Sequence, residues 1–191
     1  MANQEKHTKI LAFVGLTGSG KSSAVEYVTA KGLPKVYFSG IVLDEVQRRG
    51  LEITQENEQP IREELRETEG KDFIVKRIIS QIHDLIEAGQ DRIVADGLYT
   101  WTEYKVLKRE FPGELTVVAV VTPKHLRKQR MAKRPLRPLT SDQVDQRDWA
   151  EIENIEKGGP IAVADYFIHN DGGVEKLHTQ IDDILKTVGF L

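Results

Sequence analysis

Residues 15–22 read GLTGSGKS, a glycine-rich turn that matches the pattern G-x-x-x-x-G-K-[ST] in full. An apolar, strand-like run precedes it at residues 10–14, and a helix-like segment follows at residues 21–31. Glycines allow backbone N–H groups to turn inward around a phosphate with no Cβ in the way. The start of the following helix adds its dipole and its free N–H groups. The stretch therefore predicts a phosphate-binding loop between a strand and a helix.

Each residue of this loop has an expected role. Lys21 is expected to reach the β- and γ-phosphates of a nucleotide, and the Ser22 hydroxyl to bind Mg²⁺. A dinucleotide-binding turn is the weaker alternative, because residues 18–23 lack its third glycine. A turn without a ligand is weaker still, because it has no use for the Lys-Ser pair. The other expected nucleotide-binding residues are Gly15, Thr17, Gly18, Ser19, Gly20 and Ser23.

Strand-like and helix-like segments alternate along the whole chain. Several of the strand-like runs are apolar without alternation, which is typical of strands covered on both faces. The pattern predicts one α/β domain over residues 1–191, with a parallel sheet between two layers of helices. Ser141 is the expected N-cap of a polar helix at residues 141–156. The expected strands are residues 10–14, 36–38, 92–95, 115–121 and 164–168, and the other expected helices are 21–31, 42–49, 56–69, 72–88, 101–110, a basic helix ending near Lys133, and 174–188.

Asp96 follows the third expected strand and precedes Gly97. Ligands of open α/β sheets bind beyond the carboxyl ends of the strands, where Ser22 is also expected. A carboxylate at that edge can hold Mg²⁺ or its water, or accept a proton from an attacking hydroxyl. The alternative is a simple Asp-Gly turn. With the phosphate loop present, we favour a catalytic and metal-binding role for Asp96.

The charge of the chain is unevenly distributed. Lys and Arg total 27 and Asp and Glu total 30, yet residues 124–137 hold seven basic residues and no acidic one. Arg127, Arg130 and Arg134 lie three and four apart, so they are expected to share a helix face. Such a face would form an arginine lid that stabilises the charge of a transferring phosphoryl group. The alternative is a solvated helix face. Nucleic-acid binding is disfavoured because this segment has no aromatic residue for stacking.

Composition excludes several other classes of protein. There is no cysteine, so disulfides, thiol nucleophiles and Cys-zinc sites are excluded, and the five histidines form no pair with metal-ligand spacing. The longest apolar run, residues 115–121, is too short to span a bilayer. Residues 1–9 have no apolar signal core, so we expect a cytoplasmic protein. From the observations above, we expect neither a membrane nor a nucleic acid as its partner.

These motifs together resemble the P-loop small-molecule kinases, which include nucleoside-monophosphate kinases and dephospho-coenzyme A kinase. The likeness covers nearly the whole chain and is greatest to an archaeal-type family related to adenylate kinase. Besides the phosphate loop and Ala95-Asp96-Gly97, it rests on Arg49-Gly50-Leu51, residues 64–67 and 76–77, Arg127-x-x-Arg130, Arg147-Asp148 and Ala164-Asp165-Tyr166-x-Ile168-x-Asn170.

The resemblance implies a P-loop NTPase fold, a three-layer α/β sandwich whose five parallel strands have the order 2-3-1-4-5. It implies ATP as the phosphate donor, with Arg127 or Arg130 against the adenine or the phosphates and the loop at Asn170 beside the adenine. Arg130 and Arg134, in a lid at about residues 130–150, would stabilise the transferring group. A small metabolite, such as a nucleoside monophosphate or dephospho-coenzyme A, would bind at about residues 39–77.

Two positions depart from the family pattern. Ser39-Gly40-Ile41 follows the second expected strand, where relatives carry an acceptor-binding Asp and Arg. Tyr99 stands where relatives often have an arginine after Asp-Gly. Arg48, Arg62 or Arg66 would have to substitute, and Asp44 is either a second acid or an exposed helix carboxylate. The departures keep open a nucleotide-dependent switch or an ATPase with little kinase activity. An RNA-binding protein is the third alternative, and a GTPase is disfavoured because no Asn-Lys-x-Asp motif is present.

Overall fold

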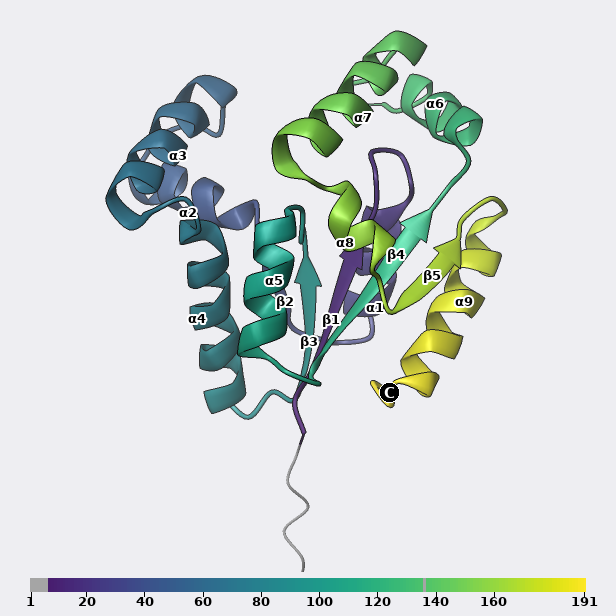
Figure 1. Ribbon diagram of the computed structural model, residues 1–191, viewed down its shortest axis with the longest axis horizontal. Helices are drawn as coiled ribbons and strands as arrows, with labels where there is room; N and C mark the ends of the chain where they lie inside the picture. Colours follow the sequence, from purple (N-terminus) through teal and green to yellow (C-terminus); the bar gives the residue numbers. More distant parts are fainter. Residues whose placement is uncertain (1–6, 136) are drawn as a thin grey trace, which may run out of the picture.

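A five-stranded parallel sheet forms the centre of the protein (Figure 1). The structure is a computed structural model that describes residues 7–135 and 137–191. The middle strand, β1 (Lys9–Val14), lies between β3 (Arg92–Asp96) and β4 (Leu115–Val121). The edge strands are β2 (Lys35–Tyr37) and β5 (Tyr166–His169). The strand order is β2-β3-β1-β4-β5, which confirms the order expected from the resemblance.

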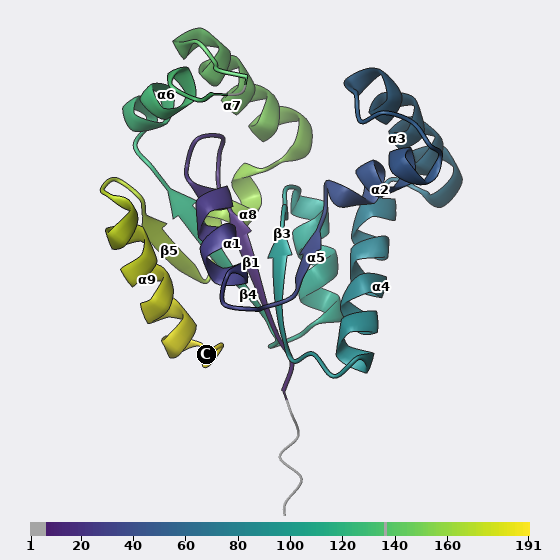
Figure 2. The same cartoon turned by 180° about the vertical axis from the view of Figure 1, so that it is seen from behind.

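Helices cover both faces of the sheet, as the continuous apolar strands predict. Figure 1 shows α4 (Phe73–Glu87), α5 (Trp101–Glu110) and the short α8 (Gly158–Ala162) in front of the sheet. Figure 2 shows α1 (Lys21–Thr29) and α9 (Val174–Thr187) on the opposite face. This arrangement is the three-layer sandwich expected from the sequence.

Four further helices stand beyond the carboxyl ends of the strands. α2 (Gly40–Arg48) and α3 (Gln55–Glu69) lie on one side, and α6 (Lys124–Ala132) and α7 (Ser141–Ile155) lie on the other. The loop that follows β1 rises beneath α6 and α7, and α2 and α3 stand apart on the other side (Figure 1). The fold thus places the phosphate loop under the expected lid, with the expected acceptor region across the edge of the sheet.

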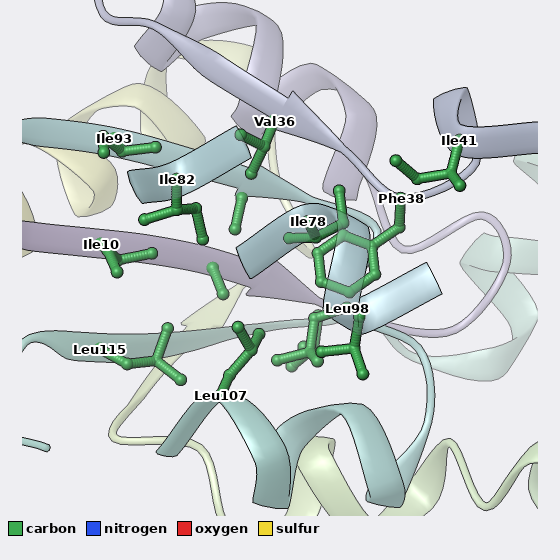
Figure 3. Close-up of a cluster of buried hydrophobic side chains, with 14 of the residues drawn as sticks. Ile10, Val36, Phe38, Ile41, Ile78, Ile82, Ile93, Leu98, Leu107 and Leu115 are labelled. Carbon is green, nitrogen blue, oxygen red and sulfur yellow. The ribbon is translucent and has the colours of Figure 1, made fainter. Parts of the chain in front are cut away.

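Each face of the sheet carries its own apolar core. Along β1, successive side chains alternate between the two cores because strand residues point to opposite faces. Leu11 and Phe13 pack with α1 and α9, and the other core lies under α2, α4 and α5. Figure 3 shows members of that second core, among them Ile10, Val36, Phe38, Ile41, Ile78, Ile82, Ile93, Leu98, Leu107 and Leu115.

The structure corrects two local expectations. Thr140, rather than Ser141, is the N-cap of α7, because its hydroxyl accepts from the Gln143 N–H while the Gln143 side chain accepts from the Thr140 N–H. The helix α8 was not expected, since its five residues include Gly158, Gly159 and Pro160, which have low helix propensity. It forms because it packs against α5 and β4.

Candidate functional site

The phosphate loop adopts a conformation that only glycine accommodates at Gly20. Gly20 has a φ of 94°, in the left-handed region, and a Cβ there would lie 2.1 Å from Asn170 Nδ2. A Cβ on Gly15 would lie 2.5 Å from Ser19 Oγ and 2.7 Å from the Val120 carbonyl oxygen. The backbone of the loop therefore approaches its surroundings more closely than a side chain would allow, as a phosphate cradle requires.

Two side chains from distant strands brace the loop from behind. The Ser19 carbonyl accepts from Asn170 Nδ2 at 2.8 Å and from Thr122 Oγ1 at 2.9 Å. Asn170 is buried and follows β5, and Thr122 follows β4. Asn170, which the resemblance is expected to place beside the adenine, contacts the phosphate loop itself. The loop shape is set by tertiary contacts as well as by its glycines.

Ser19 also carries a buried hydroxyl that has no hydrogen-bond partner within residues 7–135 and 137–191. A buried polar atom without a partner is destabilising, so native proteins satisfy such atoms with water or a ligand. The orphaned hydroxyl and the glycine cradle both fit a loop that binds an anion.

Lys21 and Asp96 meet at the carboxyl edge of the sheet, as their positions in the sequence predicted. Lys21 Nζ donates to Asp96 Oδ1 at 2.6 Å, and Lys35 Nζ lies 3.6 Å from Asp96 Oδ2. Asp96 is only 8% exposed, so two ammonium groups surround a nearly buried carboxylate. Ser22 and Ser23 lie exposed in the first turn of α1.

The oxygen donors at this edge fit a hard divalent cation. Ser22 offers a hydroxyl and Asp96 a carboxylate, and Mg²⁺ prefers oxygen ligands. Within the part of the chain that the structure describes, no cluster of three or more Asp, Glu, His or Cys side chains could enclose a metal. This donor set suits Mg²⁺, which is usually held by one or two protein groups together with substrate phosphates and waters.

Arg127 ties the expected lid to the phosphate loop. Its guanidinium binds Asp148 of α7 in a bidentate pair at 2.9 and 2.6 Å, and both residues are 5% exposed. The same guanidinium donates to the Thr17 carbonyl at 3.0 Å. Arg127 therefore orients the loop backbone through its carbonyl, and its expected contact with adenine or phosphate stays a prediction.

Of the other two lid arginines, one lies on α6 with Arg127 and one lies beyond the end of that helix. Arg130 donates to the Asn170 carbonyl at 2.9 Å, at the end of β5. Arg134 is exposed and lies beyond the end of α6, because the helix stops at Ala132. The rule of three- and four-residue spacing applies only inside a continuous helix. Their roles toward a transferring phosphoryl group stay predictions.

Two residues that sequence reasoning did not select lie close to the loop. Glu151 of α7 accepts from Thr17 Oγ1 at 3.0 Å and from Lys157 Nζ at 2.8 Å. Lys157 Nζ lies 4.9 Å from the centroid of the Tyr99 ring, and Lys21 Nζ lies 5.6 Å from the same centroid. Glu151 and Lys157 belong to no motif, so only the tertiary structure reveals them.

Burial shapes the protonation of this cluster. Burial lowers the pKa of Lys157 below its ordinary value, against the raising effect of Glu151. Burial acts to raise the pKa of Glu151, but hydrogen bonds from Lys157, Arg147 and Thr17 outweigh it, and the net pKa is lowered. Burial also raises the pKa of Tyr99, whose phenol hydrogen-bonds Ser39. At neutral pH the Glu151 carboxylate is therefore ionised and the Tyr99 phenol is neutral.

In the expected acceptor region, several basic residues are bound to nearby acids. Glu45, which is buried, accepts from Arg48 and Arg49, and Arg49 also binds Glu64 through two hydrogen bonds. Arg62 pairs with Glu58 at 3.4 Å. Of these pairs, Arg49–Glu64 ties the end of α2 to α3.

A cleft of about 280 Å³ opens between α2 and α4. Asp44 and Arg48 of α2 line one side, and Arg77 and Gln81 of α4 line the other. Asp44 is exposed, as the simpler of its two sequence interpretations predicted. The cleft offers polar groups of both signs in the region where the acceptor is expected.

Comparison with known proteins identifies the family to which this chain is similar. The family model of the AAA domain matches residues 11–157. The chain is 31% identical over 182 residues to the UPF0200 protein of Thermococcus onnurineus (strain NA1). The match covers 94% of this chain and 97% of that protein. None of the helices in the described ranges is long and apolar enough to cross a membrane.

Solved structures of small-molecule kinases share the fold. The shikimate kinase of Bacteroides thetaiotaomicron matches with a TM-score of 0.58 and 12% identity, over 95% of this chain and 98% of that one. A gluconokinase of Sinorhizobium meliloti matches with a TM-score of 0.54 and 17% identity, over 95% of this chain and 96% of that one. At such identities the likeness establishes a P-loop kinase-like fold and leaves the reaction to be argued from the site.

Proposed function

We propose that this chain, which belongs to the UPF0200 family and whose residues 11–157 match the AAA domain, is an ATP-dependent phosphotransferase acting on a small metabolite. The observation that carries the proposal is the contact of Lys21 with Asp96, 2.6 Å apart, at the mouth of the glycine loop. It joins a phosphate-binding ammonium to a carboxylate that can serve the attacking group. A phosphate-binding turn alone would not need that carboxylate.

The loop and α1 would hold the triphosphate of ATP. Backbone N–H groups of residues 15–22 and the amino end of α1 surround the phosphates, and Lys21 neutralises the β- and γ-oxygens. Ser22 and Asp96 would hold Mg²⁺, which when bound neutralises charge on the phosphate oxygens. The adenine would lie near the loop at Asn170, with Arg127 or Arg130 as its neighbour.

In the transfer, an oxygen of the acceptor attacks the γ-phosphorus of ATP. The new O–P bond forms as the bond from the γ-phosphorus to the bridging oxygen breaks, and ADP leaves with that electron pair. The proton of an attacking hydroxyl passes to Asp96 or to water, and an acceptor phosphate needs no such proton transfer. Lys21 holds Asp96 Oδ1, and so directs the carboxylate during the step.

The acceptor would bind between the phosphate loop and α2–α3, at about residues 39–77. A nucleoside monophosphate or dephospho-coenzyme A fits the expectation from the resemblance. Support comes from the position of α2 and α3, which face the loop across the carboxyl edge of the sheet (Figure 1). The cleft between α2 and α4 adds Arg48 and Arg77 as basic groups in this region.

One observation favours a second candidate, a nucleotide-binding switch or an ATPase with little kinase activity. Arg48 and Arg62, which would replace the missing acceptor arginines, each bind a glutamate of their own helix. Arginines held in this way are less available to an acceptor. ATP turnover without dependence on an acceptor would support this candidate.

The test measures ADP release from Mg·ATP with a panel of nucleoside monophosphates and dephospho-coenzyme A. Acceptor-dependent ADP release supports the phosphotransferase. Lys21→Ala should reduce turnover by about a hundred-fold or more, because it removes a preorganised charge at the phosphates. Lys31→Ala, which alters a lysine just beyond α1, is the matched control and should leave turnover unchanged. Unchanged ATP consumption in Lys21→Ala would refute the assignment.

A further inference from the structure

Lys157 is a buried lysine at the point where α7 turns into α8. Glu156 ends α7 with a φ of 53°, and the Lys157 N–H then bonds back to the Glu151 carbonyl at 3.1 Å. This closure is typical of a helix C-terminus and fixes where the next side chain points. Close packing also holds α8, since a Cβ on Gly159 would lie 2.8 Å from Trp101 Cε3. The backbone on both sides of Lys157 is therefore fixed.

The ammonium group of Lys157 is linked to the phosphate loop through Glu151. Its side chain is 5% exposed, and its Nζ binds Glu151, whose other oxygen accepts from Thr17 Oγ1 of the loop. Lys157 and Lys21 lie against the same ring, that of Tyr99. One carboxylate thus separates this ammonium from the loop, and one ring separates it from the lysine of the motif.

The charges around this point leave an excess of positive charge. Lys21, Lys35, Lys157 and Arg147 converge on Asp96 and Glu151. Burying two ammonium groups near one another is unfavourable unless negative charge compensates them. The terminal phosphates of a nucleoside triphosphate supply such charge.

We propose that Lys157 is a catalytic residue that contacts the γ-phosphate oxygens of ATP, on the opposite side from the backbone of the phosphate loop. The inference rests on the proposed function, because it assumes a triphosphate in the loop. Glu151 is then the positioning residue that holds the ammonium in place through Thr17. Two of the lid arginines already hold protein groups: Arg127 binds Asp148, and Arg130 binds the Asn170 carbonyl.

Lys157 also supplies a basic group near the position after Asp96 where relatives often carry an arginine. Tyr99 stands where an arginine is expected, and its ring is the surface on which Lys157 rests. A cation from the end of α7 therefore occupies the neighbourhood that an arginine of the β3–α5 connection would otherwise fill.

The experiment is calorimetric titration with Mg²⁺ and either a non-hydrolysable ATP analogue or ADP. Lys157→Gln should weaken binding of the analogue by about ten-fold or more, as loss of a charge-assisted hydrogen bond predicts. Binding of ADP, which has no γ-phosphate, should change by less than about three-fold. Lys128→Gln is the matched control, because it removes a lysine from an ion pair between α6 and α7 without touching the loop.

A second variant guards against misfolding. Lys157→Gln leaves Glu151 buried without its main partner, so the melting temperature is measured, and Glu151→Gln with Lys157→Gln removes both charges. The double variant should fold and still bind the analogue no better than ADP. If Lys157→Gln weakened the binding of the analogue and of ADP by the same factor, or weakened neither, the role of Lys157 would be overturned while the proposed function stayed intact. A wild-type protein that binds neither nucleotide would overturn both.

Discussion

Removing the carboxylate of Asp148 should destabilise the protein strongly. Asp148 and Arg127 are each 5% exposed, and two short hydrogen bonds join them. In Asp148→Ala the guanidinium stays buried with the Thr17 carbonyl at 3.0 Å as its remaining partner. Breaking a buried pair by removing one partner costs about 3–5 kcal/mol, because it leaves an uncompensated buried charge. We expect a loss of that size in the free energy of unfolding.

The assay is equilibrium unfolding in urea, followed by circular dichroism. Asp145→Ala is the matched control, since Asp145 lies on the same helix and forms partly exposed ion pairs with Lys124 and Lys128. Its effect should be smaller than that of Asp148→Ala, because water can hydrate both ammonium groups once the carboxylate is removed. A double variant, Arg127→Met with Asp148→Leu, should recover most of the loss by replacing both charges with apolar groups.

The result that would contradict this reasoning is specific. If Asp148→Ala lost less than about 1 kcal/mol, the guanidinium would have to reach water in the folded protein. The lid would then open in solution, and Arg127 would not hold the Thr17 carbonyl. Loss of nucleotide binding alongside the stability loss would instead support the link between the lid and the loop.

Two further variants test the loop and a buried acid. Gly20→Ala should lower the free energy of unfolding by about 2 kcal/mol or more and should weaken nucleotide binding. The alanine would be strained in the left-handed backbone conformation, and its Cβ would lie 2.1 Å from Asn170 Nδ2. Gly32→Ala, with a φ of 86° and open space around its Cβ, isolates the strain, and equal losses in both variants would argue against the clash. Hydrogen bonds from Arg48 and Arg49 lower the pKa of Glu45 to about 2 from an ordinary 4.5, so its contribution to stability is complete above pH 4.5 and disappears as the pH falls toward 2. Urea unfolding across that range should show a steeper acid loss in the wild type than in Glu45→Gln, and parallel curves would contradict the shift.

The sequence predicted the fold well because its signals are local or belong to a motif. Apolar runs marked the strands, and the phosphate loop with Asp96 marked the carboxyl edge of the sheet, where the structure brings Lys21 and Asp96 together. The strand order came from the resemblance, since local patterns say nothing about which strands pair. The short α8 was missed because packing, and not propensity, makes it helical.

The part of the site that the sequence did not reveal comes from residues with no motif. Lys157 is linked to the loop only because Glu156 turns the chain and because Glu151, which also accepts from Thr17, receives its ammonium. The lid arginines show the reverse case. Their spacing predicted one face, but α6 ends at Ala132, before Arg134. Spacing predicts shared faces inside a helix and cannot predict where the helix ends against its neighbours.

The bracing of residues 15–22 by Thr122 and Asn170 has a consequence for how the protein matures. The ribosome makes the loop early, yet its last supporting side chain emerges about 150 residues later. Because chains emerge from the amino end and distant pairings close late, the nascent loop has its glycines but not its brace until β5 has joined the sheet. The loop thus acquires its full support near the end of synthesis, and a chain cut short before residue 166 would lose that support together with the edge strand β5.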